Sequence, residues 1–303
     1  MEKMTEFQKK MVEMLGEIPV RFSEPMSQHT SFRVGGPAEV MVFPKTKDQL
    51  NKVLQMSGLM DIKIAILGAG TNVLAPDEGI SGIVICLKDC LDGMELLEGN
   101  RIRVMAGVTM TRAAVFAANH GLSGMEFAHG IPGTVGGGVY MNAGAYGGEI
   151  SQICREVEVM NRDGSVQVLT GEEMKFSYRH SALEETGSIV LSAVFELIPG
   201  NKDEIRGIMQ ELMGKRKNSQ PLDLPSAGSA FKRPVGGYAA AMIEQTGLKG
   251  FRVGDAGISE KHAGFAVNLG NATAEDVKEL LTQVSDRVYE KFEVRLEPEI
   301  RIW

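Results

Sequence analysis

Clustered glycine constrains this chain more than any other feature. Its 303 residues include 36 glycines, about 12% against a typical ~7%. One group, Gly68-Ala69-Gly70-Thr71-Asn72, directly follows an apolar run at 63–67, and a longer one, GIPGTVGGGVYMNAGAYGGEI, spans 130–150. Glycine lets the backbone approach other groups closely. Either loop alone is more simply a tight turn, but the two together indicate a ligand held by main-chain groups.

The first loop does not match the common phosphate-binding motifs. The dinucleotide fingerprint G-x-G-x-x-G requires a third glycine, but Val73 stands there and Leu74-Ala75-Pro76 does not open a helix. No glycine loop is followed by the Gly-Lys-Ser/Thr of a P-loop. Successive backbone N–H groups can still form an anion-binding nest. With a second set of amides expected from 133–138, the sequence predicts a long anionic ligand such as a dinucleotide.

Composition narrows the functional classes. The formal net charge is −7 and the sequence pI is about 5.4, which argues against a nucleic-acid partner. No apolar run approaches the ~20 residues that cross a bilayer, and the N-terminal segment lacks the pattern of a signal peptide. Three cysteines are too few for a disulfide framework, and cysteines and histidines show no metal-ligand spacing. We expect a cytoplasmic protein without a metal or a membrane partner.

Hydrophobic periodicity predicts mixed α+β structure. Strands are expected at 39–43, 63–67, 83–87, 102–106 and 188–197, and Asp163-Gly164 predicts a hairpin between 157–160 and 166–169. Helices are expected at 111–119, 238–246 and 273–292. The last of these begins with a Thr273–Asp276 capping box and carries one apolar stripe. Pro199-Gly200 interrupts the chain, so we place the domain boundary there, giving 1–199 and 200–303.

Motifs along nearly the whole chain, from about Ser31, resemble those of the UDP-N-acetylenolpyruvoylglucosamine reductase (MurB) family. The resemblance rests on SFRVGGPAEVMVFP, LGAGTNVL, the 130–150 segment, FSYRHS, AGSAFKRP, AAAMIEQTGLKG, HAGFAVNLGNATAEDV and EPEIRIW. It implies a two-part FAD-binding domain like that of the vanillyl-alcohol-oxidase flavoproteins, with subdomains at about 1–65 and 66–199. An α+β substrate-binding domain follows. Because no tyrosine-bearing insertion follows Arg179, the chain resembles the compact second subtype.

The resemblance also implies a reaction. Such enzymes reduce UDP-N-acetylglucosamine enolpyruvate to UDP-N-acetylmuramate with NADPH and FAD, in peptidoglycan synthesis that supports cell-wall growth, cell shape and division. No histidine lies in 68–72 and His129 is expected only to pack, so we expect non-covalent FAD. The implied cofactor contacts are Gly68, Ala69, Gly70, Thr71, Asn72, Pro132, Gly133, Thr134, Gly136, Gly137, Ala143, Gly144 and Arg216.

Three residues match the family's catalytic positions. Arg179, within YRHS, would face the substrate carboxylate, a task suited to a permanently charged bidentate group. Ser229, within GSAFK, would donate a proton to the substrate carbon. Glu299, within PEIR, would frame the carboxylate with Arg179. Without the resemblance, a surface arginine, a turn serine and a solvated glutamate describe these residues equally well.

Further residues are weaker candidates. By the resemblance, Gln245 and His262 border the substrate site, and Lys232 is a candidate to stabilise charge near Ser229. Arg216 lies in the run Lys215-Arg216-Lys217, which is usually a solvated helix face.

Two other functions compete with the reductase. One is an FAD oxidoreductase with another substrate, and the other is a flavin- or nucleotide-binding protein without catalysis. The joint presence of Arg179, Ser229 and Glu299 in matching contexts favours the reductase.

Overall fold

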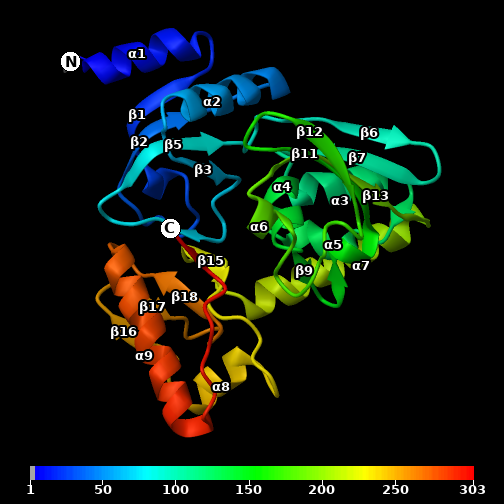
Figure 1. Cartoon of the computed structure of the whole chain (residues 1–303). Helices are drawn as coiled ribbons and strands as arrows, with labels where there is room; N and C mark the ends of the chain where they lie inside the picture. The colour runs from blue at the N-terminus through cyan, green and yellow to red at the C-terminus, as the bar shows by residue number, and fades with distance from the viewer. Residues whose placement is uncertain (1–3) are drawn as a thin grey trace. The chain divides into compact units, whose positions relative to one another are not determined.

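The computed structural model describes residues 4–303 and divides the chain into two compact units (Figure 1). The first unit contains the chain up to Ser23, then Glu39–Ala69 and Ser81–Gly214. The second contains Glu24–Ala38, Gly70–Ile80 and Lys215–Trp303. Each unit therefore consists of three segments, and the segments of the two units alternate along the chain. One boundary between the units falls between Ala69 and Gly70, in the first glycine loop. Among residues 4–303, no helix is long and apolar enough to cross a membrane.

The first unit begins with a four-stranded sheet of order β1-β2-β5-β3, in which β3 and β5 run parallel. Helices α1 and α2 pack on it, and Met11, Leu15, Leu50 and Val53 are fully buried in the shared core. Thr46 caps α2 by accepting a hydrogen bond from the Gln49 amide. The elements are α1(Glu6–Leu15), β1(Val20–Pro25), β2(Pro37–Val42), α2(Lys47–Leu59), β3(Ile64–Leu67) and β5(Ile80–Cys86).

A five-stranded sheet of order β12-β11-β13-β7-β6 completes this unit. Its central strand β13 is buried at every residue from Ile189 to Phe195, as expected for a strand covered on both faces. The strands are β6(Met94–Leu97), β7(Arg101–Met105), β11(Cys154–Met160), β12(Val166–Thr170) and β13(Ile189–Glu196). Around them lie α3(Met110–Asn119), η2(Glu126–Gly130), α4(Val135–Tyr140), α5(Ile150–Ile153), α6(Leu183–Thr186) and the short pairs β8(Leu122–Ser123) with β14(Ile198–Pro199) and β9(Gly144–Ala145) with β10(Gly148–Glu149).

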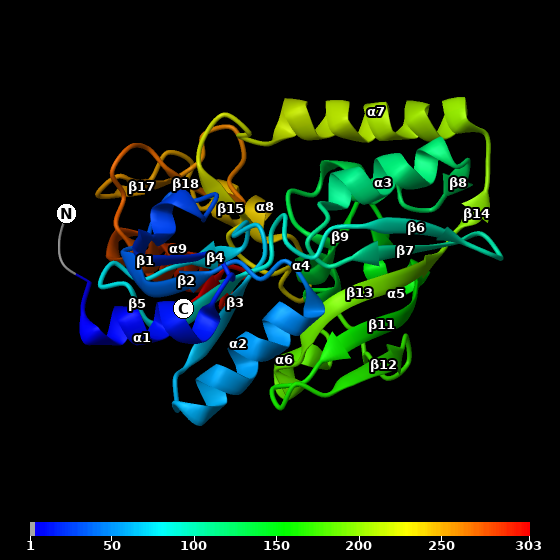
Figure 2. The ribbon, with the colours of Figure 1, turned by 90° about the horizontal axis from the view of Figure 1, so that it is seen from above.

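Helix α7(Lys202–Ser219) explains why the first unit extends beyond the expected boundary at Pro199-Gly200. Its Ile205 and Met209 are buried in the core of the first unit. Helix α7 runs beside α3 (Figure 2), and the Arg206 guanidinium donates to the side-chain oxygen of Asn119 at the end of α3. Regular secondary structure ends at Pro199-Gly200, but the helix after it packs back onto the same unit.

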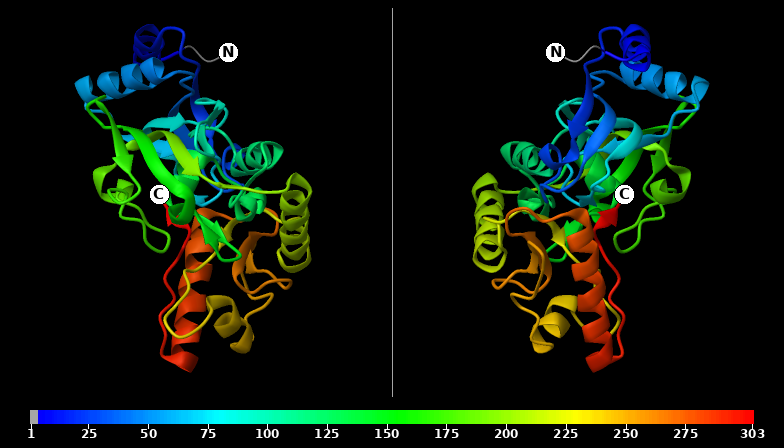
Figure 3. Two further views of the ribbon diagram at one scale, coloured as in Figure 1. Left: turned by 90° about the vertical axis from the view of Figure 1, so that its right-hand side faces the viewer. Right: turned by 90° about the vertical axis from the view of Figure 1, so that its left-hand side faces the viewer.

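The second unit is a four-stranded antiparallel sheet of order β15-β18-β17-β16, with α9 against it and α8 beside α9 (Figure 3). The predicted stripe of α9 is buried through Val277, Leu280, Leu281, Val284 and Val288. A separate two-stranded parallel sheet pairs β4 with β19. The elements are η1(Met26–Gln28), β4(Val73–Leu74), β15(Ser226–Ser229), α8(Ala239–Gln245), β16(Arg252–Val253), β17(Ala256–Ile258), β18(Phe265–Asn268), α9(Ala274–Phe292) and β19(Arg301–Ile302).

Candidate active site

The first glycine loop joins β3 to β4 and presents free main-chain donors. In residues 4–303, none of the amides from Gly68 to Asn72 donates a hydrogen bond to a protein acceptor. Gly70 is buried and the other four residues are half-buried. Buried amides without an acceptor are costly, and a run of such N–H groups suits an anion. The loop therefore fits the pyrophosphate of a dinucleotide.

Thr134 brings the second glycine region directly against Gly68. A Cβ on Gly68 would lie 2.6 Å from the Thr134 hydroxyl oxygen. Thr134 is buried and caps α4 by accepting from the Gly137 amide. Glycine at position 68 is thus required by a close approach within the first unit, and the two loops singled out in the sequence meet there.

The second loop does not provide the expected second set of free amides. The amides of Val135 and Gly136 donate to the carbonyls of Val108 and Ala106, and the amide of Gly138 donates to that of Thr134. The segment from Val135 to Tyr140 is helix α4 rather than an open turn. Its glycines serve packing, since a Cβ on Gly138 would lie 2.8 Å from the Met110 sulfur. The expectation of two nests is corrected to one nest, at 68–72.

Arg179 lies in a strained tight turn of the first unit. Ser177 and His180 exchange backbone hydrogen bonds across it, and Arg179 has φ 57°, a left-handed conformation that is uncommon outside glycine. The guanidinium donates to the Gly144 carbonyl at 3.2 Å and lies over the Tyr178 ring at 4.9 Å. The structure therefore brings Arg179 to the Ala143-Gly144 segment predicted to contact the cofactor.

Backbone pairing places Ala230, the residue after Ser229, opposite Glu299 in the second unit. The Glu299 amide donates to the Ala230 carbonyl, and the Lys232 amide donates to the Glu297 carbonyl. Phe231 and Pro298 form the bridge between the two antiparallel segments. Ser229 is exposed at the end of β15, and Glu299 is half-buried. Two residues 70 positions apart in sequence thus occupy neighbouring segments.

His262 is linked to the Ser229 segment through Gly264. Its Nδ1 accepts a hydrogen bond from the Gly264 amide, and the Gly264 carbonyl accepts from the Ala230 amide. Burial lowers the pKa of His262. The ring is therefore neutral near pH 7, with its hydrogen on Nε2 available to donate.

Three further candidates were predicted to contact the substrate or the cofactor: Lys232, Gln245 and Arg216. The Lys232 ammonium is paired with the Glu297 carboxylate. Gln245 is exposed at the end of α8, where its carbonyl accepts from Lys291. Arg216 is half-buried in the last turn of α7.

Sequence reasoning missed several supporting residues. Fully buried Asn142 donates to the Ser177 carbonyl and so holds the Arg179 turn. Ser31 uses its hydroxyl to bond the Ser226 carbonyl at 2.6 Å and its amide to bond the Gly70 carbonyl. Buried Nδ1 of His129 has no hydrogen-bond partner among residues 4–303. Asn142 stood inside the glycine-rich motif and could have been chosen there, but the Ser31 contact has no local signal.

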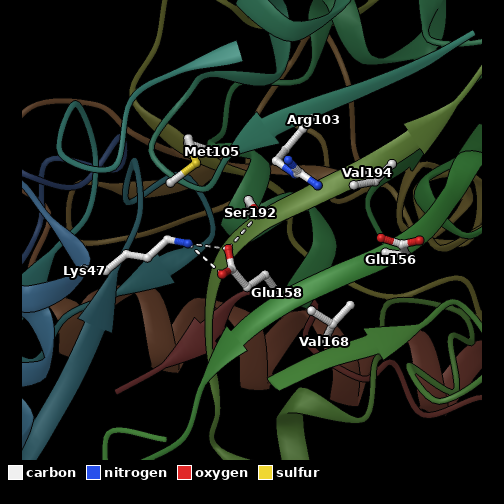
Figure 4. A pocket seen from close by; sticks show the side chains of 8 residues that line it. All are labelled: Lys47, Arg103, Met105, Glu156, Glu158, Val168, Ser192 and Val194. Carbon is white, nitrogen blue, oxygen red and sulfur yellow. Dashed lines mark hydrogen bonds and ion pairs between the residues drawn. The ribbon is translucent and has the colours of Figure 1, made fainter. Parts of the chain in front are cut away.

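Two other features do not contribute to this site. A hollow on the five-stranded sheet is lined by Lys47, Glu158 and Ser192 among others, but by none of the predicted residues (Figure 4). Its central charges neutralise one another, because Lys47 pairs with Glu158 at 2.6 Å. The cysteines are buried, and burial raises the pKa of Cys86 to about 11 and that of Cys154 to about 12. Neither thiol ionises near neutral pH.

Known proteins match both halves of the chain. The family model "FAD binding domain" matches residues 38–170, and the model "UDP-N-acetylenolpyruvoylglucosamine reductase, C-terminal domain" matches 220–303. The UDP-N-acetylenolpyruvoylglucosamine reductase of Caldanaerobacter subterraneus subsp. tengcongensis is 46% identical over 97% of this chain and 96% of its own length. That of Agathobacter rectalis is 44% identical over 98% of both. The chain belongs to the UDP-N-acetylenolpyruvoylglucosamine reductase family.

A solved structure agrees with this membership. The crystal structure of the family's enzyme from Thermus caldophilus matches with a TM-score of 0.78 and 37% identity, covering 95% of this chain and 99% of that one. The predicted family, the α+β fold with an FAD-binding domain and the FAD-dependent reductase class are confirmed. The roles of individual site residues stay predictions.

Proposed function

We propose that this chain reduces the enolpyruvyl group of UDP-N-acetylglucosamine enolpyruvate to form UDP-N-acetylmuramate in peptidoglycan precursor synthesis, with non-covalent FAD and NADPH as reductant. The observation that supports the proposal most directly is the backbone pairing of Ala230, the residue after Ser229, with Glu299, through the Glu299 amide and the Ala230 carbonyl. A proton donor and a carboxyl group on adjacent segments suit the protonation step of this reduction.

The free amides of Gly68–Asn72 would hold the FAD pyrophosphate, and Thr134, which lies against Gly68, would border it. Proposed contacts are Gly68, Ala69, Gly70, Thr71, Asn72, Pro132, Gly133, Thr134, Gly136, Gly137, Ala143, Gly144 and Arg216. FAD, when bound, supplies hydride transfer. Because no glycine loop of the sequence matches the dinucleotide fingerprint that would hold NADPH separately, NADPH and substrate would use one site in turn.

Three side chains then have distinct tasks. The Arg179 fork binds the substrate carboxylate and stabilises the enolate-like charge that develops there. Ser229 donates its hydroxyl proton to the substrate carbon adjacent to the one that receives hydride. Glu299 shares a proton with the carboxylate.

Substrate binding would involve Lys232, His262 and Gln245. The Lys232 ammonium would exchange the exposed Glu297 carboxylate for the substrate's diphosphate, since both are anions. His262 is neutral, so it would donate one hydrogen bond from Nε2 rather than supply charge. Gln245 is the most remote of the three and would contact the substrate's far end.

Separating the two half-reactions tests this assignment. NADPH should bleach the flavin of a Ser229→Ala variant at the wild-type rate, because that step needs no proton at the substrate carbon. Reoxidation by the enolpyruvyl substrate should slow by about 10²–10⁴-fold. Ser226→Ala, which removes another serine hydroxyl from the same strand, should change neither rate. Unchanged reoxidation in Ser229→Ala would remove Ser229 from the mechanism.

A further inference from the structure

Both main-chain polar groups of Glu299 are hydrogen-bonded within the second unit. Its amide donates to the Ala230 carbonyl at 2.9 Å, next to Ser229. Its carbonyl accepts from the side-chain amide of Asn72 at 3.2 Å. One side of the peptide is therefore fixed by the Ser229 segment, and the other by the last residue of the first glycine loop.

Asn72 makes a different contact with each of its polar groups. The side chain reaches Glu299, and the main-chain carbonyl accepts from the Arg301 amide at 3.0 Å. The main-chain N–H belongs to the set of amides without a protein acceptor among residues 4–303. The same residue thus faces the C-terminal segment through two groups and leaves its amide for an anion.

Backbone bonds of Glu297 and Glu299 to the Ser229 segment hold the start of the C-terminal segment, and strand β19 holds its end. Strand β19 is two residues long and pairs with β4 alone, with Arg301 opposite Val73 and Ile302 opposite Leu74. The Trp303 amide adds one bond to the Leu74 carbonyl. Because short strand pairs are marginal by themselves, the Asn72 side chain adds to the bond between Glu299 and Ala230 in fixing the backbone just before β19.

We propose that Asn72 is a positioning residue for Glu299, in addition to any contact that its main chain makes with the cofactor. Its side chain sets where the Glu299 backbone lies, and through it the carboxyl group relative to Ser229. The inference rests on the catalytic role proposed for Glu299, and it links the loop that would hold FAD to the segment that would meet the substrate.

Asn72→Ala separates the two roles, because it removes the side chain and keeps the main-chain N–H. FAD affinity and bleaching by NADPH should stay within about threefold of wild type. Reoxidation by the enolpyruvyl substrate should slow about tenfold, the effect of losing one hydrogen bond of ordinary net strength. Hydrogen exchange of residues 297–303 should accelerate in the FAD-bound variant, whereas exchange of α9 should not.

Two companion variants make the outcome decisive. Thr273→Ala weakens the cap of α9 in the same unit and should leave both half-reactions unchanged, so it controls for general destabilisation.

Glu299→Gln tests the role on which the inference rests. If Glu299→Gln slows reoxidation and Asn72→Ala does not, the positioning role is overturned while the proposed function stands. If Glu299→Gln has no effect, the role of Glu299 itself fails. Equal slowing of both half-reactions, or FAD loss in Asn72→Ala, would reduce Asn72 to a cofactor or structural residue.

Discussion

Single atoms decide the geometry of the first glycine loop. A Cβ on Gly68 would lie only 2.6 Å from the Thr134 hydroxyl oxygen, and a Cβ on Gly70 would clash with the His29 carbonyl. Gly70 also has φ 63°, which disfavours any residue with a side chain. A side chain at position 70 therefore displaces the main chain of His29. A side chain at position 68 meets only the side chain of Thr134, so a smaller residue at position 134 can make room for it.

We expect Gly68→Ala to weaken FAD binding and Thr134→Ala to restore part of it. The added methyl meets the Thr134 hydroxyl at 2.6 Å, and removing that hydroxyl clears the space. Contacting residues typically show coupling energies of about 0.5–3 kcal/mol. FAD dissociation constants of the two single variants and the double variant measure this coupling. Strictly additive losses would mean that the Gly68–Thr134 approach does not shape the loop.

The neutral state of His262 predicts a pH dependence of stability. Burial lowers its pKa from the usual 6.5, so the unfolded chain binds this proton more readily than the folded one. The stabilisation is complete above the unfolded pKa and is lost as the pH falls through the folded pKa. In urea titrations from pH 8 to about pH 5, wild type should lose more stability than His262→Asn, whose amide oxygen can still accept from Gly264. If the free energy of unfolding falls equally with pH in wild type and in His262→Asn, His262 is not a buried neutral histidine.

Secondary elements were predictable where their signals are local. The Asp163-Gly164 hairpin forms with Met160 opposite Val166, and the Thr273–Asp276 capping box opens α9. Helix α4 was not predicted, because Gly136, Gly137 and Gly138 are poor helix formers. It forms because Thr134 caps it and because Val135 and Val139 are fully buried.

Helix α9 has a second cap that no local pattern indicates. The Asp77 carboxylate accepts from the amides of Ala274 and Glu275, at 2.8 and 3.1 Å. Asp77→Ala should lower the free energy of unfolding by about 1–2 kcal/mol, and Thr273→Ala by about 1 kcal/mol. Only Asp77→Ala should accelerate hydrogen exchange at residues 70–80, because only Asp77 ties that segment to the helix. Equal exchange at 70–80 in both variants would show that Asp77 acts as a helix cap alone.

At the scale of the molecule, the sequence predicted the family and the FAD-dependent reductase class, but it did not indicate that segments of the two units alternate along the chain. The two units interleave, since 24–38 and 70–80 belong with the C-terminal part. That arrangement depends on pairings such as Val73 with Arg301, whose partners are too distant in sequence for periodicity to connect them. The expected subdomain limit near 65 also differs from the first sheet, which takes in β5 from Ile80 to Cys86.

Anaerobic reoxidation of the reduced flavin by the enolpyruvyl nucleotide tests the central claim most directly. The FAD-loaded protein is bleached with one equivalent of NADPH, freed of NADP⁺ and mixed with UDP-N-acetylglucosamine enolpyruvate in a stopped-flow instrument. The account predicts that the oxidised-flavin spectrum returns in a single turnover and that UDP-N-acetylmuramate forms in equal amount. A flavin that NADPH bleaches but that stays reduced with this substrate would contradict it and would favour an FAD oxidoreductase with another substrate.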